Sequence, residues 1–391
     1  MIAIAFWISL FLLVYPLFLY PPLLELLVRL LGRTKGLCGE EANAVENFQR
    51  NLELPAVSIL LSVYNEKEII TEKIDNFLAL KYPQERLELV VVSDGSDDGT
   101  DELISMHTAL RICEDRVKLV RQTTRQGKSV ALNAAALVAH GEILLFTDAD
   151  SMLAPESLSL LVKPFACPQV DLVSGRSIYV DASGRENEGS LYRRFEEWLK
   201  QREGRLYGIS GADGALYAMR ASAYNPLEPE YINDLLHPVQ VALSGKLSIA
   251  VPEANVIERD LSRSSGDEFA RQTRIMAQSW LIFLRYTGTV LRQKRFGFFW
   301  QIVSHKVLRW LTLPLLGVNA IAAIWTPGKT PLFCLIGIGV FFLLTFFGSR
   351  LQGGRFPRVA WYFSLQSAAA MNGLFQLWQG ERYVTWKPRG N

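Results

Sequence analysis

Two aspartates separated by a single residue could together bind a divalent cation. Asp148 and Asp150 directly follow the apolar run 143–146 in the sequence EILLFTDADSM. Side chains two positions apart on an extended segment point to the same side, and Mg²⁺ and Mn²⁺ prefer oxygen ligands such as carboxylates. The acidic end of a buried strand is the more ordinary explanation of such a pair. The elements around the pair must therefore decide between a metal site and a structural turn.

The region that begins at Leu54 alternates strand-like and helix-like patterns. Four strands are predicted from the segments PAVSILLSVYN, LELVVVSDGSDDGT, VKLVRQ and EILLFTDAD. Helical spacing of apolar residues separates them, as in EKEIITEKIDNFLAL and SVALNAAALVAH. This alternation predicts an α/β fold with a mainly parallel sheet that helices cover on both faces. The uninterrupted apolar runs Leu89–Val92 and Ile143–Phe146 fit burial on both sides.

Polar residues stand where three of these strands end. Asn65 and Glu66 follow the first strand, Asp94 follows the second, and Asp148 follows the fourth. Ligands of open α/β sheets bind outside the carboxyl ends of the strands. The three strand ends therefore predict one shared polar cleft. The expected presence of other polar residues in this cleft favours a functional role for Asp148 and Asp150.

The composition indicates a membrane protein. Of the 391 residues, 49% are hydrophobic and only 20% are charged, which is too apolar for an ordinary soluble enzyme. The formal net charge of +2 gives no reason to expect nucleic acid as a partner. The four cysteines and four histidines are widely scattered, so neither a zinc site nor a disulfide framework is predicted.

Three segments are long and apolar enough to cross a bilayer. They are residues 2–24, 307–326 and 331–349. A cleaved signal peptide fits the first poorly, because it lacks a basic start and a small-residue cleavage site. Arg29, which follows the first segment, begins a basic cluster that predicts an outside N-terminus and a cytoplasmic domain after it.

Two further segments are expected to lie in the membrane interface. Residues 359–378 contain Gln366, Asn372 and Gln376 and precede a basic tail, which favours an interfacial or re-entrant helix over a full crossing. The segment RQKRFGFFWQIVSHKVLRW mixes aromatic and basic residues and is expected to lie along the interface as well.

The ordered motifs resemble a known enzyme family. The segments VSILLSVYNEKEII, LVVVSDGSDDGT, GKSVALNAAA and LLFTDADS resemble the nucleotide-binding half of family 2 glycosyltransferases. The resemblance is strongest to the membrane-bound branch that includes cellulose, hyaluronan and poly-N-acetylglucosamine synthases, and it covers about residues 55–285. It implies a GT-A fold, which is a Rossmann-like α/β domain, together with a nucleotide-sugar donor and Mg²⁺ or Mn²⁺.

The same resemblance implies roles for residues that bind the donor. Asp94 matches the aspartate that contacts uridine, and Glu66 stands where the family lines the nucleoside pocket. Lys128 matches a lysine near the nucleotide, where a positive charge suits a pyrophosphate. Asp148 and Asp150 match the family's metal-binding pair, whose cation also holds the donor diphosphate.

The acceptor half of the family pattern is less regular in this chain. LYGISGADGALYAMR, with Gly211 and Asp213, resembles the segment near the acceptor. Relatives often carry Glu-Asp where this chain has Asn233-Asp234, and Asp234 matches the general base that deprotonates the acceptor hydroxyl. A helix-capping aspartate is the competing interpretation of Asp234, and His237 nearby is expected to be structural.

A later arginine-rich segment departs from the processive members of the family. EFARQTRIMAQSW falls where those members carry Gln-x-x-Arg-Trp. Arg274 is the expected diphosphate contact, since arginine suits phosphate groups, and Trp280 is the expected acceptor contact. The missing Gln and Trp weaken a prediction of long-polymer synthesis.

These observations predict an inverting, membrane-anchored glycosyltransferase. We expect an N-terminal transmembrane helix at 1–30, a cytoplasmic catalytic domain at 53–285, and interfacial and transmembrane helices at 290–391 in a multi-pass protein of the plasma (inner) membrane. The expected donor is a UDP-sugar, and the expected acceptor is a lipid-linked or polysaccharide glycan of the cell envelope. Other polysaccharide-biosynthesis proteins are candidate partners.

Three alternatives stay open or are disfavoured. A processive β-polysaccharide synthase would extrude its polymer through its own helices. A membrane-bound nucleotidyltransferase or sugar-nucleotide-binding regulator would share the acidic site without acceptor chemistry. A transporter is disfavoured, because the largest coherent block is an α/β domain without paired transmembrane repeats.

Overall fold

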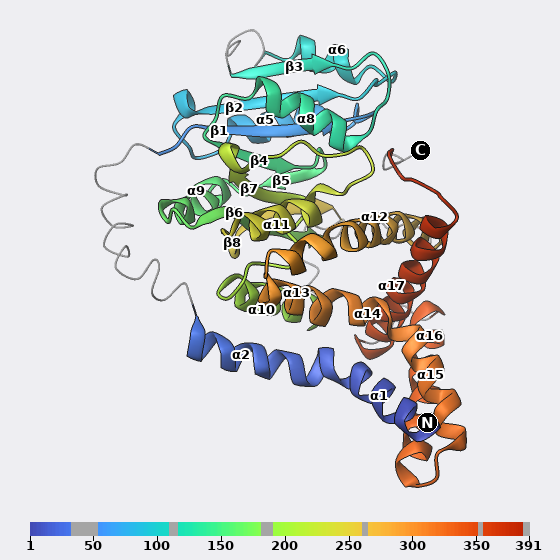
Figure 1. Cartoon of the computed structure of the whole chain (residues 1–391). Coiled ribbons are helices and arrows are strands. Elements are labelled where there is room, and N and C mark those ends of the chain that lie inside the picture. Colours follow the sequence, from blue (N-terminus) through green and yellow to red (C-terminus); the bar gives the residue numbers. More distant parts are fainter. Residues whose placement is uncertain (33–53, 109–115, 181–190, 260–264, 351–354, 386–391) are drawn as a thin grey trace. The chain divides into compact units, whose positions relative to one another are not determined.

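The chain folds into two compact units. The computed structural model describes residues 1–32, 54–108, 116–180, 191–259, 265–350 and 355–385 (Figure 1). The helical unit comprises Met1–Leu30, Ser190–Leu199 and Ser262–Arg382, and the sheet unit comprises Leu31–Gly189, Lys200–Leu261 and Tyr383–Asn391. The predicted division of the chain at 53–285 and 290–391 stays a prediction.

The sheet unit contains an eight-stranded sheet in the order β3-β2-β1-β4-β7-β6-β8-β5. Strands β1 to β4 are mutually parallel where they pair, which confirms the predicted parallel block. Strand β7 pairs antiparallel with both β4 and β6, so the complete sheet is mixed. The strands are β1 (Val57–Val63), β2 (Leu87–Ser93), β3 (Val117–Arg121), β4 (Ile143–Thr147), β5 (Ser151–Leu153), β6 (Val170–Val180), β7 (Leu216–Arg220) and β8 (Leu247–Arg259).

Helices pack on both faces of this sheet, as the continuous apolar strands predict. Because side chains alternate along a strand, Ile59 joins one buried cluster with Ile74, whereas Leu60 joins a second cluster with Leu132. Full burial of each such side chain contributes roughly 1.5–3 kcal/mol. The helical elements are α5 (Ile70–Leu78), η2 (Gln84–Arg86), α6 (Thr100–Met106), α8 (Lys128–Val138), α9 (Ser157–Val162), η3 (Lys163–Ala166), η4 (Ala221–Ala223) and α11 (Asn233–Ser244).

A close backbone approach fixes the start of β4 beside β1. The N–H of Gly141 donates to Ser58 Oγ at 2.7 Å, and the N–H of Ile143 donates to the carbonyl of Ala56 at 3.1 Å. A Cβ atom at Gly141 would lie 2.4 Å from the backbone nitrogen of Ser58. Only glycine therefore fits where the chain enters the strand that leads to Asp148.

The helical unit holds long apolar helices. Within the described residues, two helices are long and apolar enough to cross a membrane, Ile2–Leu31 and Lys329–Gly348. Its elements are α1 (Ile2–Val14), η1 (Tyr15–Leu19), α2 (Tyr20–Leu31), α12 (Ser265–Arg292), α13 (Phe296–Ile302), η5 (Val303–Val307), α14 (Leu308–Trp310), α15 (Thr312–Trp325), α16 (Lys329–Arg350) and α17 (Arg355–Trp378), and α10 (Leu191–Gly204) has residues in both units.

The predicted span 307–326 requires a correction. The chain bends by 68° between Phe296–Trp310 and Thr312–Trp325, so this segment is two helices and not one. The 14 residues of α15 rise about 21 Å at 1.5 Å each, which is less than the roughly 30 Å of a bilayer core. The bent pair counts as a third span only when both of its helices are included. The interfacial interpretation of 359–378, which falls within α17, stays a prediction.

Buried polar contacts tie the apolar helices to one another. The amide of Asn319 in α15 donates to the carbonyl of Phe6 at 3.1 Å and to Ser9 Oγ at 3.0 Å. The indole N–H of Trp280 in α12 donates to the carbonyl of Ala370 in α17 at 3.0 Å. These bonds fix helix pairings that apolar surfaces alone leave free to slide.

We expect Gly141→Ala to destabilise the sheet unit by about 1–3 kcal/mol, the usual range for overpacking. The added methyl group cannot avoid Ser58, whose backbone is held by β1. The measurement is the thermal midpoint of the purified protein. Gly288→Ala in α12 is the matched control, because a Cβ there meets nothing within 4 Å. An unchanged midpoint for Gly141→Ala would contradict the close approach.

Candidate functional site

The carboxyl ends of β1, β2 and β4 lie side by side at one edge of the sheet. Strand β1 pairs in parallel with β2 on one side and with β4 on the other. The N–H of Asp94, which follows β2, donates to the carbonyl of Val63 at the end of β1 at 2.8 Å. The strand-end residues that the sequence singled out are therefore brought to one edge.

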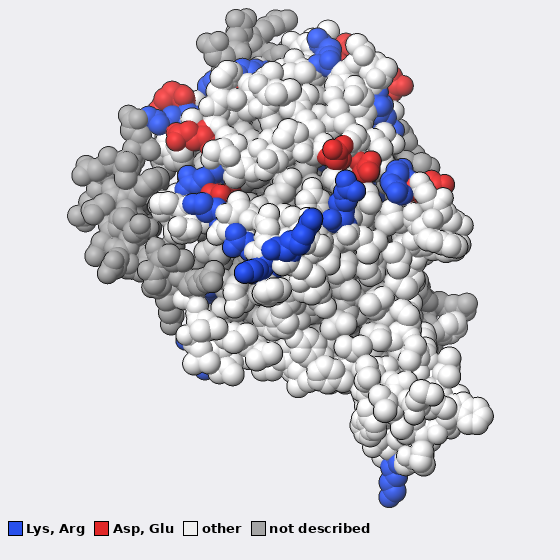
Figure 2. Space-filling model, in the orientation of Figure 1, with Lys and Arg blue, Asp and Glu red and all other residues white. Residues whose placement is uncertain are grey.

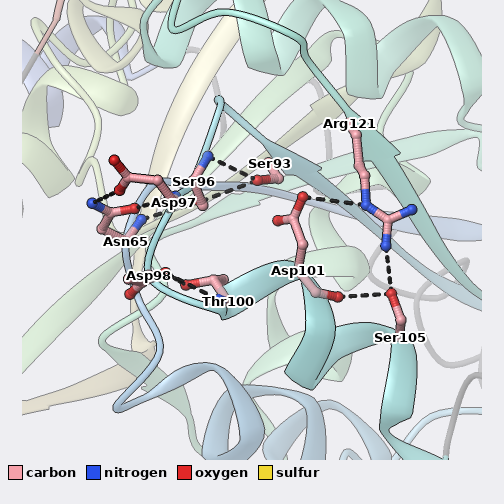
Figure 3. Close-up of polar contacts among 9 residues, drawn as sticks. All are labelled: Asn65, Ser93, Ser96, Asp97, Asp98, Thr100, Asp101, Ser105 and Arg121. Carbon is pink, nitrogen blue, oxygen red and sulfur yellow. Dashed lines mark hydrogen bonds and ion pairs between the residues drawn. The ribbon is translucent and has the colours of Figure 1, made fainter.

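Asn65 locks the end of β1 to the loop that follows β2 (Figure 3). Its φ of 54° is left-handed, a conformation that asparagine tolerates better than most residues. Its amide donates to Asp97 Oδ1 at 2.8 Å, and the N–H of Asp97 donates back to Asn65 Oδ1 at 3.0 Å. The backbone N–H of Asn65 donates to Ser96 Oγ at 3.2 Å. The sequence pattern placed Asn65 at the site but did not reveal this lock.

Glu66 is held by the start of α6. Its backbone N–H donates to Thr100 Oγ1 at 3.0 Å, and the Thr100 hydroxyl donates to Asp98. On the far side of the same helix, Arg121 binds Asp101 at 3.2 Å (Figure 3). The SDGSDDGT segment is therefore a hydrogen-bonded loop that positions the backbone of Glu66.

Asp94 is fully buried beneath the loop that precedes α8. Its two carboxylate oxygens accept the N–H groups of Gln126 at 2.6 Å and Gly127 at 2.8 Å. These bonds link the end of β2 to the start of α8. In this arrangement Asp94 anchors a loop, and its predicted contact with uridine stays a prediction.

A segment near the C-terminus lies against the same loop. A Cβ at Gly127 would lie 2.2 Å from the carbonyl oxygen of Val384, and Gly127 has a left-handed φ of 95°. Residues from Tyr383 onward belong to the sheet unit although they follow the last helix of the helical unit. No local pattern predicts this contact, because it joins residues more than 250 positions apart.

Lys128 brings a positive charge to Asp148. It is the first residue of α8, and its ammonium donates to Asp148 Oδ1 at 2.5 Å. Both side chains are partly exposed, so neither is sealed within the core. The positive end of a helix and a lysine side chain together suit an anion beside the carboxylate.

Asp148 and Asp150 occupy the turn between β4 and β5. The turn is closed by the N–H of Ser151, which donates to the carbonyl of Asp148 at 3.3 Å. Among the described residues, no group of three His, Cys, Asp or Glu side chains gathers as a ready-made metal site. Two carboxylates fit a cation that takes its other ligands from water and phosphate oxygens, which is the usual coordination of Mg²⁺ at nucleotide sites.

Asp234 lies at the start of α11 and shares the electrostatic environment of this turn. Burial raises the pKa of its carboxyl, Lys128 and Lys200 lower that pKa, and Asp213 and Asp148 raise it. A Cβ at Gly214 would lie 2.9 Å from Asp234 Oδ2, so a larger residue at 214 would displace this carboxylate.

An aromatic cluster holds the helix that carries Asp234. The amide of Asn233 donates to the Tyr217 hydroxyl at 2.7 Å, and that hydroxyl bonds His237 Nδ1 at 2.9 Å. Burial lowers the pKa of His237 to about 3, so the imidazole is neutral. Its Nδ1 accepts a hydrogen bond from the Tyr217 hydroxyl. Phe146 of β4 stacks on Tyr217 with ring centroids 4.6 Å apart. The structural role expected for His237 agrees with this arrangement.

The residues predicted to bind acceptor have other contacts in the structure. Gly211 is buried, and the Asp213 carboxylate accepts bonds from the N–H and hydroxyl of Ser177 at 2.8 and 2.9 Å. Trp280 is buried in the helical unit and stacks edge-on against Trp310 at 4.9 Å. Arg274 lies on the same helix, α12. Arg274 and Trp280 belong to the helical unit, and their predicted roles stay predictions.

Comparison with known proteins identifies the domain. A family model described as glycosyl transferase family 2 matches residues 58–225. This chain carries a family 2 glycosyltransferase domain. The predicted family and the predicted enzyme class are confirmed for this domain.

Curated relatives of the glycosyltransferase domain are similar over a limited length. The β-monoglucosyldiacylglycerol synthase of Trichormus variabilis is 30% identical over 178 residues, which are 43% of this chain and 36% of the relative. The poly-β-1,6-N-acetyl-D-glucosamine synthase of Staphylococcus aureus is 33% identical over 124 residues, 32% of this chain and 29% of the relative. The chain thus matches well under half of the length of these relatives.

A solved structure resembles nearly the whole chain. The mannosyltransferase PcManGT from Pyrobaculum calidifontis, in complex with GDP-Man and Mn²⁺, superposes with a TM-score of 0.64 at 23% identity. The match covers 89% of this chain and 97% of that chain. The likeness confirms the predicted GT-A-like fold of the glycosyltransferase domain.

We expect Asp234→Asn to raise the thermal midpoint at neutral pH by about 2–4 °C, the shift that 1 kcal/mol produces in a domain of 150–250 residues. A raised folded-state pKa means that the ionised carboxylate destabilises the fold above that pKa and is harmless when protonated. The gain should therefore shrink toward zero as the pH falls to about 3, below the ordinary aspartate pKa of about 3.9. The measurement is the thermal midpoint of both proteins across this pH range.

Asp213→Asn is the matched control for that experiment. The Asp213 carboxylate accepts hydrogen bonds from Ser177 and from the N–H of Ala215, so its replacement should lower the midpoint. A lower midpoint for Asp234→Asn at neutral pH would mean that the Asp234 carboxylate stabilises the fold.

Proposed function

We propose that this protein is a membrane-anchored, inverting glycosyltransferase that transfers a sugar from a nucleotide-sugar donor to a glycan acceptor of the cell envelope. The observation that carries this proposal is the meeting of three charges at one edge of the sheet. Lys128 bonds Asp148 directly, and both residues act electrostatically on Asp234. Sugar transfer from a diphosphate donor needs three groups: a site for a cation, a site for an anion, and a carboxylate of raised pKa.

We expect the donor diphosphate to bind between Lys128 and the Asp148–Asp150 turn. Asp148 and Asp150 would hold a divalent cation, Mg²⁺ or Mn²⁺, which when bound would neutralise charge on the departing nucleoside diphosphate. Lys128 forms an ion pair with Asp148 in this structure. Its side chain is flexible, so its ammonium can turn to a phosphate oxygen when the donor binds. Glu66 and Asp94 border the nucleoside, and a UDP-sugar is the expected donor.

Asp234 acts as the general base. Its carboxylate takes the proton of the acceptor hydroxyl while the acceptor oxygen forms a bond to the anomeric carbon. The bond between that carbon and the diphosphate oxygen breaks, and its electron pair leaves with the nucleoside diphosphate. A single displacement of this kind inverts the anomeric configuration. Burial raises the pKa of Asp234 toward the working pH, which suits a general base.

The acceptor is proposed to be lipid-linked or a polysaccharide at the membrane surface. Support comes from the two apolar helices Ile2–Leu31 and Lys329–Gly348, and from relatives named for a glycolipid and for a polysaccharide. The basic residues that follow the first apolar helix favour a multi-pass protein of the inner membrane with a cytoplasmic catalytic domain. Arg274 and Trp280 are proposed diphosphate and acceptor contacts, as are Gly211 and Asp213 on the acceptor side.

We expect Asp148→Ala and Asp150→Ala each to weaken Mn²⁺-dependent binding of a UDP-sugar at least about 10-fold, because each removes one of two protein ligands. The measurement is calorimetric titration of the purified protein with and without Mn²⁺. Glu156→Gln is the control, since Glu156 is an exposed carboxylate that pairs with Lys81. If both alanine variants kept full metal-dependent binding of the UDP-sugar, Asp148 and Asp150 would have only a structural role in the turn.

The central test of the proposal is sugar transfer itself. Purified membranes are incubated with radiolabelled UDP-sugars or GDP-mannose and Mn²⁺, and the products are separated by size and by lipid extraction. Asp234→Asn should lower transfer by about 10²–10⁴-fold, the usual contribution of a general base, and leave donor binding within twofold.

The outcomes separate the competing functions. Full transfer activity in Asp234→Asn would remove Asp234 as the base. Donor binding without transfer in the wild-type protein would favour the nucleotidyltransferase or regulator. A ladder of long products would select the processive synthase over single transfer.

A further inference from the structure

A lysine lies fully buried beneath the proposed metal-binding turn. Lys73 belongs to α5, is only 2% exposed, and is among the largest fully buried side chains of the protein. Burial lowers its pKa to about 7, and Asp148 and Glu258 raise it. Burying an ammonium group is unfavourable unless it is paired, so its retention here needs a reason.

The ammonium of Lys73 binds both ends of the turn. Nζ donates to Thr147 Oγ1 at 3.0 Å and also to the carbonyl oxygen of Ser151. Thr147 immediately precedes Asp148, and Ser151 immediately follows Asp150. One side chain therefore closes the three-residue segment that carries both proposed metal ligands.

Attachment of α5 to β5 does not require this lysine. Asn76, three residues later in α5, donates to the carbonyl of Leu153 and accepts its N–H, both at 2.9 Å. Ile74 and Phe77 bury the apolar face of the same helix. The packing of α5 against the sheet could be made by an apolar side chain at position 73. A positive charge at this position is needed only if negative charges lie close to it.

Negative charge does collect above and beside Lys73. Asp148 stands on the turn, and Glu258 of β8, which is 3% exposed, lies opposite Ser151 in the strand register. Two carboxylates held close enough to share a cation repel each other when the cation is absent. The Lys73 ammonium below the turn opposes that repulsion, and its hydrogen bonds to the Thr147 hydroxyl and the Ser151 carbonyl hold the two ends of the turn from which both ligands project.

We propose that Lys73 is a positioning residue that holds Asp148 and Asp150 in the geometry needed to bind a divalent cation. The inference rests on the proposed metal role of that pair. Groups that orient metal ligands from behind typically change metal affinity by about 10–100-fold when they are removed. Lys73 touches neither ligand side chain in the hydrogen bonds described, and it acts through the Thr147 hydroxyl and the Ser151 carbonyl, which bracket the two ligands.

The test replaces Lys73 by methionine, which keeps the length of the side chain and removes its charge and donors. Binding of Mn²⁺ is measured in the presence of UDP by electron paramagnetic resonance, which counts free Mn²⁺ without relying on activity. We expect the Mn²⁺ dissociation constant of Lys73→Met to rise about 10-fold or more. The thermal midpoint in EDTA should fall, because Lys73→Met leaves the Thr147 hydroxyl and the Ser151 carbonyl without their donor and removes the positive charge near the buried Glu258.

Asn76→Ala is the matched control on the same helix. It breaks two bonds between α5 and β5 away from the turn, so it should lower the thermal midpoint and leave the Mn²⁺ dissociation constant within twofold. Thr147→Val is a milder second variant that removes one acceptor of Lys73, and it should raise the Mn²⁺ dissociation constant in the same direction with a smaller effect.

The outcomes distinguish this inference from the proposed function. Unchanged Mn²⁺ binding in Lys73→Met, with Asp148→Ala strongly impaired, would overturn the role of Lys73 and leave the metal site standing. Unchanged Mn²⁺ binding in Asp148→Ala would overturn the metal site itself. Equal losses of stability and Mn²⁺ affinity in Lys73→Met and Asn76→Ala would make Lys73 a structural residue only.

Discussion

The parallel pairing of β1 with both β2 and β4 is the constraint on which the site depends. This pairing places three strand ends at one edge of the sheet, so the polar residues after Val63, Ser93 and Thr147 become neighbours. Close backbone packing at Gly141 and the Asp94 carboxylate then fix the neighbouring loops by short hydrogen bonds. The loops that carry the charged side chains are positioned by the sheet beneath them, and the Lys128 and Asp148 side chains stay partly exposed.

Charge balance is the second organising feature of the sheet unit. Asp148 pairs with Lys128, and its charge raises the pKa of the buried Lys73. Asp234 belongs to the same group, since its pKa responds to Lys128 and Asp148. The aromatic cluster around Tyr217 and a neutral His237 holds the helix of Asp234 without adding charge.

Much of the α/β core was predictable because its signals are local. Each strand from β1 to β4 is a short apolar run that ends in polar residues, and each helix between them shows a helical period. The antiparallel β7 and the long β6–β8 pair were not predicted, because strand direction depends on contacts between distant segments. The bend at Leu311 was missed for a similar reason, since hydropathy averages over a segment and does not register a break in helix direction.

The sequence by itself determined which residue types meet the site, because strand ends, glycine turns and the spacing of Asp148 and Asp150 are written in short stretches of chain. Only the tertiary structure decided how those residues are held. Lys73 looks like one more polar position of a surface helix, and Val384 belongs to an unremarkable tail. Their positions beneath the turn and against Gly127 arise from packing between segments far apart in the chain, and such packing leaves no local pattern.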